Sequence, residues 1–184
     1  LKNTISELQE VSDKLFDKIK SLVEVIPNIP SDDVPSGIDE NDNQIIKTYG
    51  EKRQFLFTPK SHDELGLQLQ MMDFDQAANI SGARFVILKS KLAKLERALA
   101  TFMLDLHVDN HNYTEVNPPS LVRSKSLYGT GQLPKFEEDL FRTNSDHWLI
   151  PTAEVPLTNL VSGSIIDIND LPLRFTGLTN CFRS

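Results

Sequence analysis

The sequence predicts an α+β fold in which an antiparallel sheet is flanked by helices and preceded by one extended helix. Strand-like apolar runs occur at irregular intervals between long helical patterns, whereas repeating βαβ units would alternate regularly. The first 26 residues also carry a heptad pattern that no later segment repeats. We therefore expect a helical segment at 1–27, a linker at 28–60 and a globular part at 61–184.

The composition is that of an ordinary globular protein, with 184 residues, 39% hydrophobic and 24% charged. No apolar run reaches the ~18 residues of a membrane span, and the N-terminus lacks the pattern of a secretory signal. The single cysteine, Cys181, excludes an internal disulfide and suits a reducing cytoplasm. The net charge of −7 argues against nucleic-acid binding over the whole surface, although not by a local patch. Because the first residue is Leu1 and not Met, we expect a fragment or a processed chain.

Residues 1–27 are expected to form a helix with a coiled-coil seam. Leucine alternates with isoleucine at a 4-3-4-3 spacing, which favours two-stranded coiled coils. The alternative is an ordinary amphipathic helix packed on a globular core. Because the chain holds no second heptad segment, a coiled coil would need a partner helix from elsewhere. The seam residues are Leu1, Ile5, Leu8, Ser12, Leu15, Ile19, Leu22 and Ile26.

Residues 28–60 are expected to form an acidic linker. Pro27 and Pro30 end the preceding helix, because proline lacks the N–H that a helix interior needs. The stretch 31–43 then holds five acidic residues and neither Lys nor Arg, which is typical of a solvated connector. We place a domain boundary here.

The globular part is expected to contain one long helix among shorter elements. Ser90 is predicted to cap this helix, which should end near His111 with Asn112 in the left-handed conformation. Residues 133–141 mix aromatic and acidic side chains, as expected for a lip over a cleft. The other predicted elements are helices over 63–72, 73–80 and 153–160, and strands over 84–89, 116–122, 148–151 and 173–183.

The most informative local feature is Thr152-Ala153-Glu154, at a predicted strand-to-helix junction. A carboxylate pairs with an ammonium group, a threonine hydroxyl both donates and accepts, and the N–H groups of the first helical turn add donors. These groups could bind a small, polar, positively charged ligand. On local pattern alone, a helix-capping fragment is the simpler explanation.

Other candidate sites are weaker. The loop Gly129-Thr130-Gly131 lacks the Gly-Lys-Ser/Thr ending of a phosphate loop and the third glycine of a dinucleotide loop. His107 and His111 have helical zinc-site spacing but no adjacent metalloprotease glutamate, so a solvent-facing helix end is favoured and no metal ligands are assigned. Cys181 has no neighbouring base and is expected in a buried strand.

Arg183 lies at the end of the last predicted strand and has no partner in its local sequence. Guanidinium is the preferred bidentate ligand for phosphate or carboxylate, because its planar fork matches both groups. An ordinary surface arginine is the alternative.

Several longer segments resemble bacterial-type seryl-tRNA synthetases, which are class II aminoacyl-tRNA synthetases. The most specific are residues 128–136, YGTGQLPKF, and residues 149–160, LIPTAEVPLTNL. The sequence departs from the family pattern at Asn112, where glycine is usual, and at Asn180, where proline is common. Residues 81–89, 102–107 and 113–119 are similar to the motif 1 region, and residues 181–184 to the opening of motif 2.

The resemblance implies a serine–tRNA ligase with a class II synthetase-like sheet. Such an enzyme activates L-serine with ATP to seryl-adenylate and transfers the seryl group to tRNA(Ser). We expect a cytoplasmic homodimer that uses Mg²⁺ with ATP. The implied roles are L-serine binding by Thr152, Ala153 and Glu154, catalysis at the ATP α-phosphate by Arg183, ATP binding by Arg183 and Ser184, and a dimer interface at Pro119.

The resemblance also implies that the active site is incomplete in these 184 residues. The sequence stops inside motif 2, so motif 3 and the ligands of the serine hydroxyl are expected outside it. Residues 1–27 resemble only the end of the second helix of a two-helix, tRNA-binding coiled-coil arm. We therefore expect a fragment that is inactive alone, and the alternative is a non-catalytic, synthetase-derived dimerisation or binding module.

Overall fold

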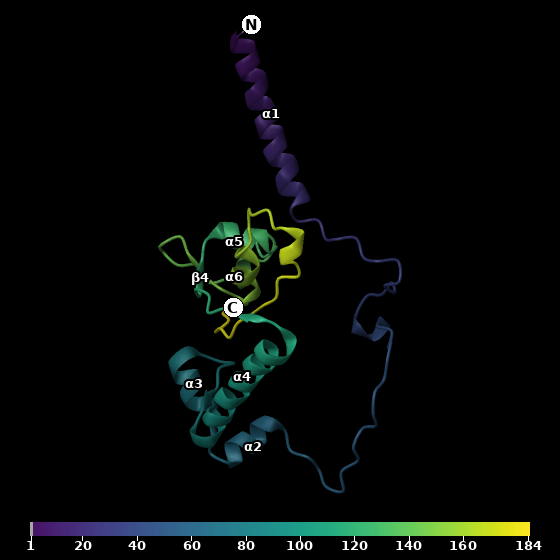
Figure 1. The fold of residues 1–184 in the computed structure, drawn as a ribbon, viewed down its shortest axis with the longest axis vertical. Helices are drawn as coiled ribbons and strands as arrows, with labels where there is room; N and C mark the ends of the chain where they lie inside the picture. The colour runs from purple at the N-terminus through teal and green to yellow at the C-terminus, as the bar shows by residue number, and fades with distance from the viewer. Residues whose placement is uncertain (1) are drawn as a thin grey trace. The chain divides into compact units, whose positions relative to one another are not determined.

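The computed structural model describes residues 2–184, so Leu1, the first predicted seam residue, lies outside the described residues. The chain divides into two compact units, Leu1–Met72 and Asp73–Ser184. Each unit is drawn in Figure 1, in purple to blue for the first and in teal to yellow for the second.

The first unit begins with one long helix, α1 (Lys2–Val23), which carries the predicted seam residues from Ile5 to Leu22. It ends earlier than the predicted residue 27, so Ile26 lies beyond it. None of its residues is buried; Leu8, for example, is 65% exposed and Ile19 is 60% exposed. Within its own unit, α1 is therefore not packed on a globular core. Its apolar residues face solvent along its whole length, which is the condition expected of a coiled-coil helix seen without its partner.

The linker that follows is exposed and has one short 3₁₀ helix, η1 (Glu40–Asp42). Helix α2 (His62–Gln68) then begins at a reciprocal capping box. The Ser61 N–H donates to Glu64 Oε2 at 2.9 Å, and the Glu64 N–H donates to Ser61 Oγ at 3.5 Å. The helix ends before the predicted residue 72, because Gln70 takes a left-handed φ of 56°.

The strand β1 (Met72–Asp73) lies at the division between the units and is hydrogen-bonded to β2 (Ile87–Leu88). Between them lies α3 (Phe74–Ser81), capped by Asp73, which accepts from the Gln76 N–H at 2.9 Å. Asp73 also forms an ion pair with Lys89 at 2.5 Å. The predicted strand over 84–89 shortens to β2, because Arg84 has a φ of 71°, which extended backbone excludes.

Helix α4 (Ser90–His111) has the predicted bounds and ends as predicted, with Asn112 left-handed at φ 56°. The predicted cap at its start is wrong. Lys89 holds the capping position, and no side chain donates or accepts a capping hydrogen bond there.

The strands form separate two-stranded sheets. The β4 (Leu121–Val122) and β5 (Trp148–Leu149) strands pair antiparallel, as predicted. The β3 (Thr114–Glu115) and β6 (Phe175–Thr176) strands pair parallel, so the antiparallel prediction is wrong for them.

The predicted strands over 116–122, 148–151 and 173–183 are also shorter in the structure, where they are reduced to β4, β5 and β6. The run over 116–122 is interrupted at Pro118 and Pro119, because proline has no backbone N–H to donate to a neighbouring strand. In the last run, Gly177 follows β6 in close contact with the Val116 carbonyl. A Cβ at Gly177 would lie 2.6 Å from the Val116 oxygen, so a side chain does not fit there.

Two short helices, α5 (Ser124–Gly129) and α6 (Glu154–Asn159), pack against the β4–β5 pair. Figure 1 shows them lying together beside β4. Two 3₁₀ turns, η2 (Glu137–Asp139) and η3 (Ile168–Asp170), complete the fold. No helix of the described residues is long and apolar enough to cross a membrane. The core consists of Val122, Leu127, Trp148, Ile150 and Val155, with Leu133 and Leu140 packed against it.

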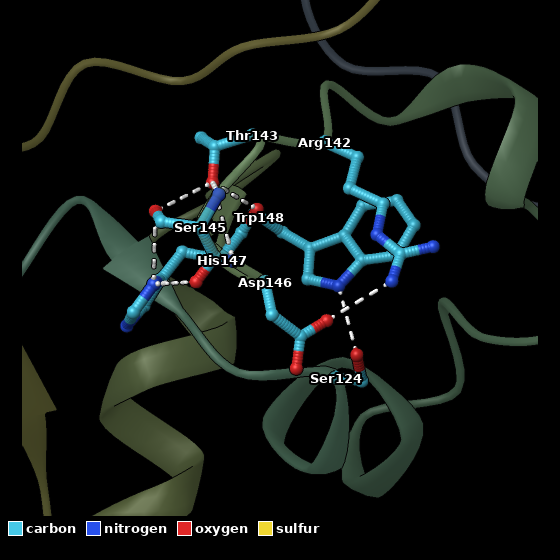
Figure 2. A network of polar contacts seen from close by, with 7 residues as sticks. All are labelled: Ser124, Arg142, Thr143, Ser145, Asp146, His147 and Trp148. Carbon is cyan, nitrogen blue, oxygen red and sulfur yellow. Dashed lines mark hydrogen bonds and ion pairs between the residues drawn. The ribbon is translucent and has the colours of Figure 1, made fainter.

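Trp148 is the largest side chain of this core, and it is held on two sides (Figure 2). Its Nε1–H donates to Ser124 Oγ at 2.9 Å, and the Arg142 guanidinium lies 5.2 Å from the ring centroid. Arg142 also pairs with Asp146 at 3.0 Å, across the turn that joins it to Trp148. The turn is closed by Thr143, whose N–H donates to the His147 carbonyl at 2.8 Å. These contacts fix the orientation of β5, which leads directly into residues 151–154.

We predict that Leu127→Ala lowers the free energy of unfolding of the second unit by about 2–5 kcal/mol. Leu127 is 0% exposed, so truncation leaves a cavity next to Trp148. The fluorescence of Trp148, the single tryptophan, reports unfolding of this core in urea. Leu178→Ala is the matched control, because Leu178 is 59% exposed. Equal shifts of the two midpoints would contradict this location of the core.

We also predict a pH-dependent contribution from Asp73. Its hydrogen bond with Lys89 lowers the pKa of the Asp73 carboxyl below the ordinary value of 3.8. The stabilisation is therefore complete above that value and is lost as the pH falls through the lower folded-state pKa. The difference in stability between the native protein and Asp73→Asn, followed by circular dichroism, should narrow below about pH 4. Asp105→Asn, at an exposed site on α4, is the control. The prediction would be refuted if the difference in stability between the native protein and Asp73→Asn stayed constant from pH 7 to pH 3.

Candidate functional site

The candidate site is built on the backbone of Ile150, which is fully buried. The Ile150 N–H donates to the Ser120 carbonyl at 3.0 Å, and the Ile150 carbonyl accepts from the Phe182 N–H at 2.9 Å. Residues near 120, 150 and 182 therefore lie side by side, although they are far apart in the sequence. This arrangement brings the C-terminal arginine next to the segment that contains Thr152 and Glu154.

Arg183 is fixed at the base of its guanidinium group. Its Nε–H donates to the Pro151 carbonyl at 3.4 Å, and Pro151 is buried. The next residue, Ser184, is bonded to η2: its N–H donates to the Asp139 carbonyl at 3.3 Å, and its Oγ–H donates to the Glu138 carbonyl at 3.1 Å. The position of Arg183 is therefore set from both sides by main-chain acceptors.

Arg183 lines a cavity of about 460 Å³, which we call the arginine cavity. Its wall combines one cation, Arg183, with one carboxylate, Asp139, and with an amide from Gln132. Such a wall suits a ligand that carries both negative charge and hydrogen-bonding groups. The lining residues are Gln132, Phe136, Asp139, Leu140, Pro151, Arg183 and Ser184.

Sequence reasoning identified Arg183 and Ser184 in this cavity but assigned no role to Gln132 or Asp139. It expected residues 133–141 to form a lip over a cleft, and Phe136, Asp139 and Leu140 do line the cavity. Gln132 directly follows the two glycines of the loop Gly129-Thr130-Gly131. It also lies inside the segment 128–136 that resembles the synthetase family, and this segment is the sequence signal that could have indicated it.

The Thr152 hydroxyl is engaged locally. Its Oγ1 accepts from the Glu154 N–H at 3.3 Å, and the Thr152 carbonyl accepts from the Val155 N–H at 3.3 Å. Thr152 thus accepts a hydrogen bond from the first residue of α6, whereas the capping position itself is held by Ala153, which makes no side-chain capping bond. A hydroxyl that accepts from the backbone can still donate its own hydrogen to a ligand.

Glu154 is exposed and lines a second cavity, of about 620 Å³, between α6 and the segment before β6. This cavity is largely apolar, with Leu157, Leu173 and Phe175 in its wall. The structure thus places Glu154 and Arg183 on different cavities. They are connected through the chain, because the carbonyl that Arg183 contacts belongs to Pro151, directly before Thr152.

The predicted interface residue Pro119 is exposed, next to the buried Pro118. Helix α4 carries further exposed apolar side chains, although each is more often found inside a protein. They include Leu95 at 51%, Leu99 at 49%, Phe102 at 60% and Met103 at 53% exposure.

Cys181 is exposed, so its predicted burial is wrong. The reason is that β6 ends at Thr176 and the chain beyond it is not part of a sheet. His107 and His111 are exposed at the end of α4, as predicted, with their Nδ1 atoms 3.1 Å apart. Among residues 2–184, no group of three or more His, Cys, Asp and Glu side chains could hold a metal ion.

Comparisons with curated proteins and with solved structures both give seryl-tRNA synthetases. No protein-family model matches the chain. The serine–tRNA ligases of Brucella canis and Brucella suis are each 56% identical to it over 184 residues, which is 100% of this chain and 43% of the relative. The chain therefore spans less than half the length of the curated relatives that it matches.

Solved structures agree with this similarity. The seryl-tRNA synthetase from Pyrococcus horikoshii, complexed with ATP, has a TM-score of 0.88 and 34% identity, over 97% of this chain and 44% of that one. The cytoplasmic serine–tRNA ligase from Naegleria fowleri has the same fold, with a TM-score of 0.83 and 21% identity, over 97% of this chain and 43% of that one. Over its whole length, the chain is similar to part of the seryl-tRNA synthetases.

Proposed function

We propose that the protein acts as a serine–tRNA ligase, which activates L-serine with ATP and transfers the seryl group to tRNA(Ser). The observation that carries the proposal is the arginine cavity, found in a chain that is 56% identical to serine–tRNA ligases. The Pyrococcus horikoshii relative is complexed with ATP, which supports ATP as the nucleotide here.

Activation needs no protein nucleophile. A carboxylate oxygen of serine bonds to the α-phosphorus of ATP, the bond to the bridging oxygen breaks, and pyrophosphate leaves. The protein therefore has to position the two substrates and neutralise the charge that they carry. Arg183 would bind the α-phosphate, and its Nε–H bond to the Pro151 carbonyl would limit the motion of the guanidinium plane.

The serine ammonium group would be bound by Glu154, with Thr152 and Ala153 beside it. An exposed carboxylate at the start of α6 is accessible to a small ligand. Because Thr152 already accepts from the Glu154 N–H, the two residues are held together as one unit. Ser184 would lie at the ATP side, where it lines the arginine cavity.

Mg²⁺ would accompany ATP and neutralise charge on its phosphates. Mg²⁺ is usually held by one or two carboxylates together with substrate phosphates, so it does not need a cluster of protein ligands. Asp139 is a carboxylate in the wall of the arginine cavity and fits this requirement.

The proposed protein is a cytoplasmic homodimer. The exposed apolar side chains of α4, together with Pro119, support a dimer interface there, because such a row is normally covered in an assembled protein. The exposed seam of α1 supports a coiled-coil arm that contacts tRNA(Ser). The antiparallel β4–β5 pair is proposed as part of a class II synthetase sheet.

We predict that Glu154→Ala abolishes most serine activation. The test uses the full-length product of the gene that encodes these residues and measures serine-dependent ATP–pyrophosphate exchange. Loss of the carboxylate that binds the ammonium group should lower kcat/KM for serine by about 100-fold, corresponding to about 3 kcal/mol. Glu51→Ala, in the exposed linker, is the matched control and should leave exchange unchanged.

Exchange that is equal in Glu154→Ala and in the native protein would refute the role of Glu154. A native protein that forms dimers but catalyses no exchange would instead identify the non-catalytic dimerisation or binding module. Active native protein that remains a monomer would refute the interface at Pro119.

A further inference from the structure

We propose that Gln132 is a further binding residue of the arginine cavity, and that its amide nitrogen donates to an oxyanion oxygen of the ligand that Arg183 binds. The ligand class is a phosphate or a carboxylate. The proposal relies on the proposed function for the choice of ATP and L-serine as probes, and its geometry comes from the hydrogen bonds around Gln132.

The main chain of Gln132 is anchored on both sides. Its N–H donates to the Leu127 carbonyl at 3.0 Å, and its carbonyl accepts from the Phe136 N–H at 2.8 Å. Leu127 is 0% exposed and belongs to the core. Gln132 therefore has a fixed position, although it lies in a loop, and only its side chain is available to a ligand.

The side chain is connected to a polar network behind the cavity. The Thr130 hydroxyl lies within hydrogen-bonding distance of both Gln132 Oε1 and the Ser126 carbonyl, the second at 3.1 Å. The Asn159 amide donates to the same Ser126 carbonyl at 2.9 Å and to the Val155 carbonyl at 2.8 Å. The network thus joins α5, α6 and the loop that carries Gln132.

The single hydrogen of the Thr130 hydroxyl decides how the amide is oriented. The Ser126 carbonyl already accepts from Asn159, so Thr130 can donate to Gln132 Oε1 and leave no carbonyl unpaired. In this arrangement the amide oxygen faces Thr130. The amide nitrogen is then the group that Gln132 offers to the cavity, which Gln132 lines and which also holds Arg183.

Two donors from distant parts of the chain thus meet on one cavity. Arg183 supplies a cation whose Nε is held by Pro151, and Gln132 supplies a neutral donor held by Thr130. An oxyanion can accept from both, because each of its oxygens has several acceptor sites. The carboxylate of Asp139 disfavours a bare anion and favours one that also carries hydroxyl, amino or metal-bound groups. ATP and L-serine both meet this requirement.

The decisive variant is Gln132→Glu in the full-length gene product, because it keeps the shape of the side chain and replaces the donor with a carboxylate oxygen. ATP and L-serine are titrated separately by calorimetry. The Kd of at least one of them should rise about tenfold or more, since a donor to a charged oxygen is replaced by a like charge. A rise for ATP identifies a phosphoryl oxygen, and a rise for serine alone identifies the carboxylate.

Asn144→Asp is the matched control, because it makes the same amide-to-carboxylate change at an exposed site in the turn after Arg142. Its Kd values should stay within twofold of those of the native protein. Thr130→Val and Thr130→Ser test the network without altering the cavity wall. The valine variant should weaken binding, and the serine variant, which keeps the hydroxyl, should restore it.

Unchanged Kd values for both ligands in Gln132→Glu would overturn the proposal. They would mean that Gln132 presents its amide oxygen, and not its nitrogen, to the cavity, because glutamate keeps an oxygen at that place. If that variant does not fold, equal binding by Thr130→Val and Thr130→Ser would overturn it. A native protein that binds neither probe would also overturn it. If ATP binding depends on Gln132 but serine-dependent exchange is absent, the proposed function fails and the role of Gln132 stands.

Discussion

The buried backbone of Ile150 is the constraint on which the rest of the second unit depends. Its N–H and carbonyl bond to Ser120 and to Phe182, so three distant segments share one line of hydrogen bonds. A buried peptide group must have such partners, because an unpaired one loses its bonds to water without replacement. Side chains near Ile150 are held as well: Trp148 contacts Ser124 and Arg142, and the Pro151 carbonyl accepts from Arg183. Packing, chain path and the position of the cationic group are thus set at one strand.

Two polar groups in the wall of the arginine cavity are held in place by hydrogen bonds to other parts of the protein. Arg183 is bonded to a main-chain carbonyl, and Gln132 is bonded to the Thr130 hydroxyl. Groups fixed in this way lose little freedom when a ligand binds, which is the physical basis of preorganised sites. Glu154 is different, because it lies on another and largely apolar cavity and is exposed. In the proposed enzyme, the arginine side of the site is therefore better ordered than the serine side.

Local sequence patterns predicted the elements whose signals are local. The heptad spacing indicated α1, and the bounds of α4 with its left-handed Asn112 were correct. The errors in strand pairing and in the membership of the cavity have non-local causes. A parallel or antiparallel pairing is decided by which distant segments meet, so the β3–β6 pair could not be derived from either run alone. The same holds for Gln132 and Asp139, whose shared cavity with Arg183 exists only after Phe182 has docked on Ile150. Resemblance to a family could identify Arg183, because its motif is contiguous in the sequence.

The most direct test of this account is native-state amide hydrogen exchange at Ile150 and Phe182, measured on the full-length gene product without ligand. Both amides donate to buried or paired carbonyls on the same line of hydrogen bonds, so they should open together with the core. The account predicts that the Phe182 amide is as strongly protected as the Ile150 amide. Exchange of Phe182 at the rate of an unstructured peptide, with Ile150 still protected, would show that Arg183 is not positioned by this strand and would contradict the account.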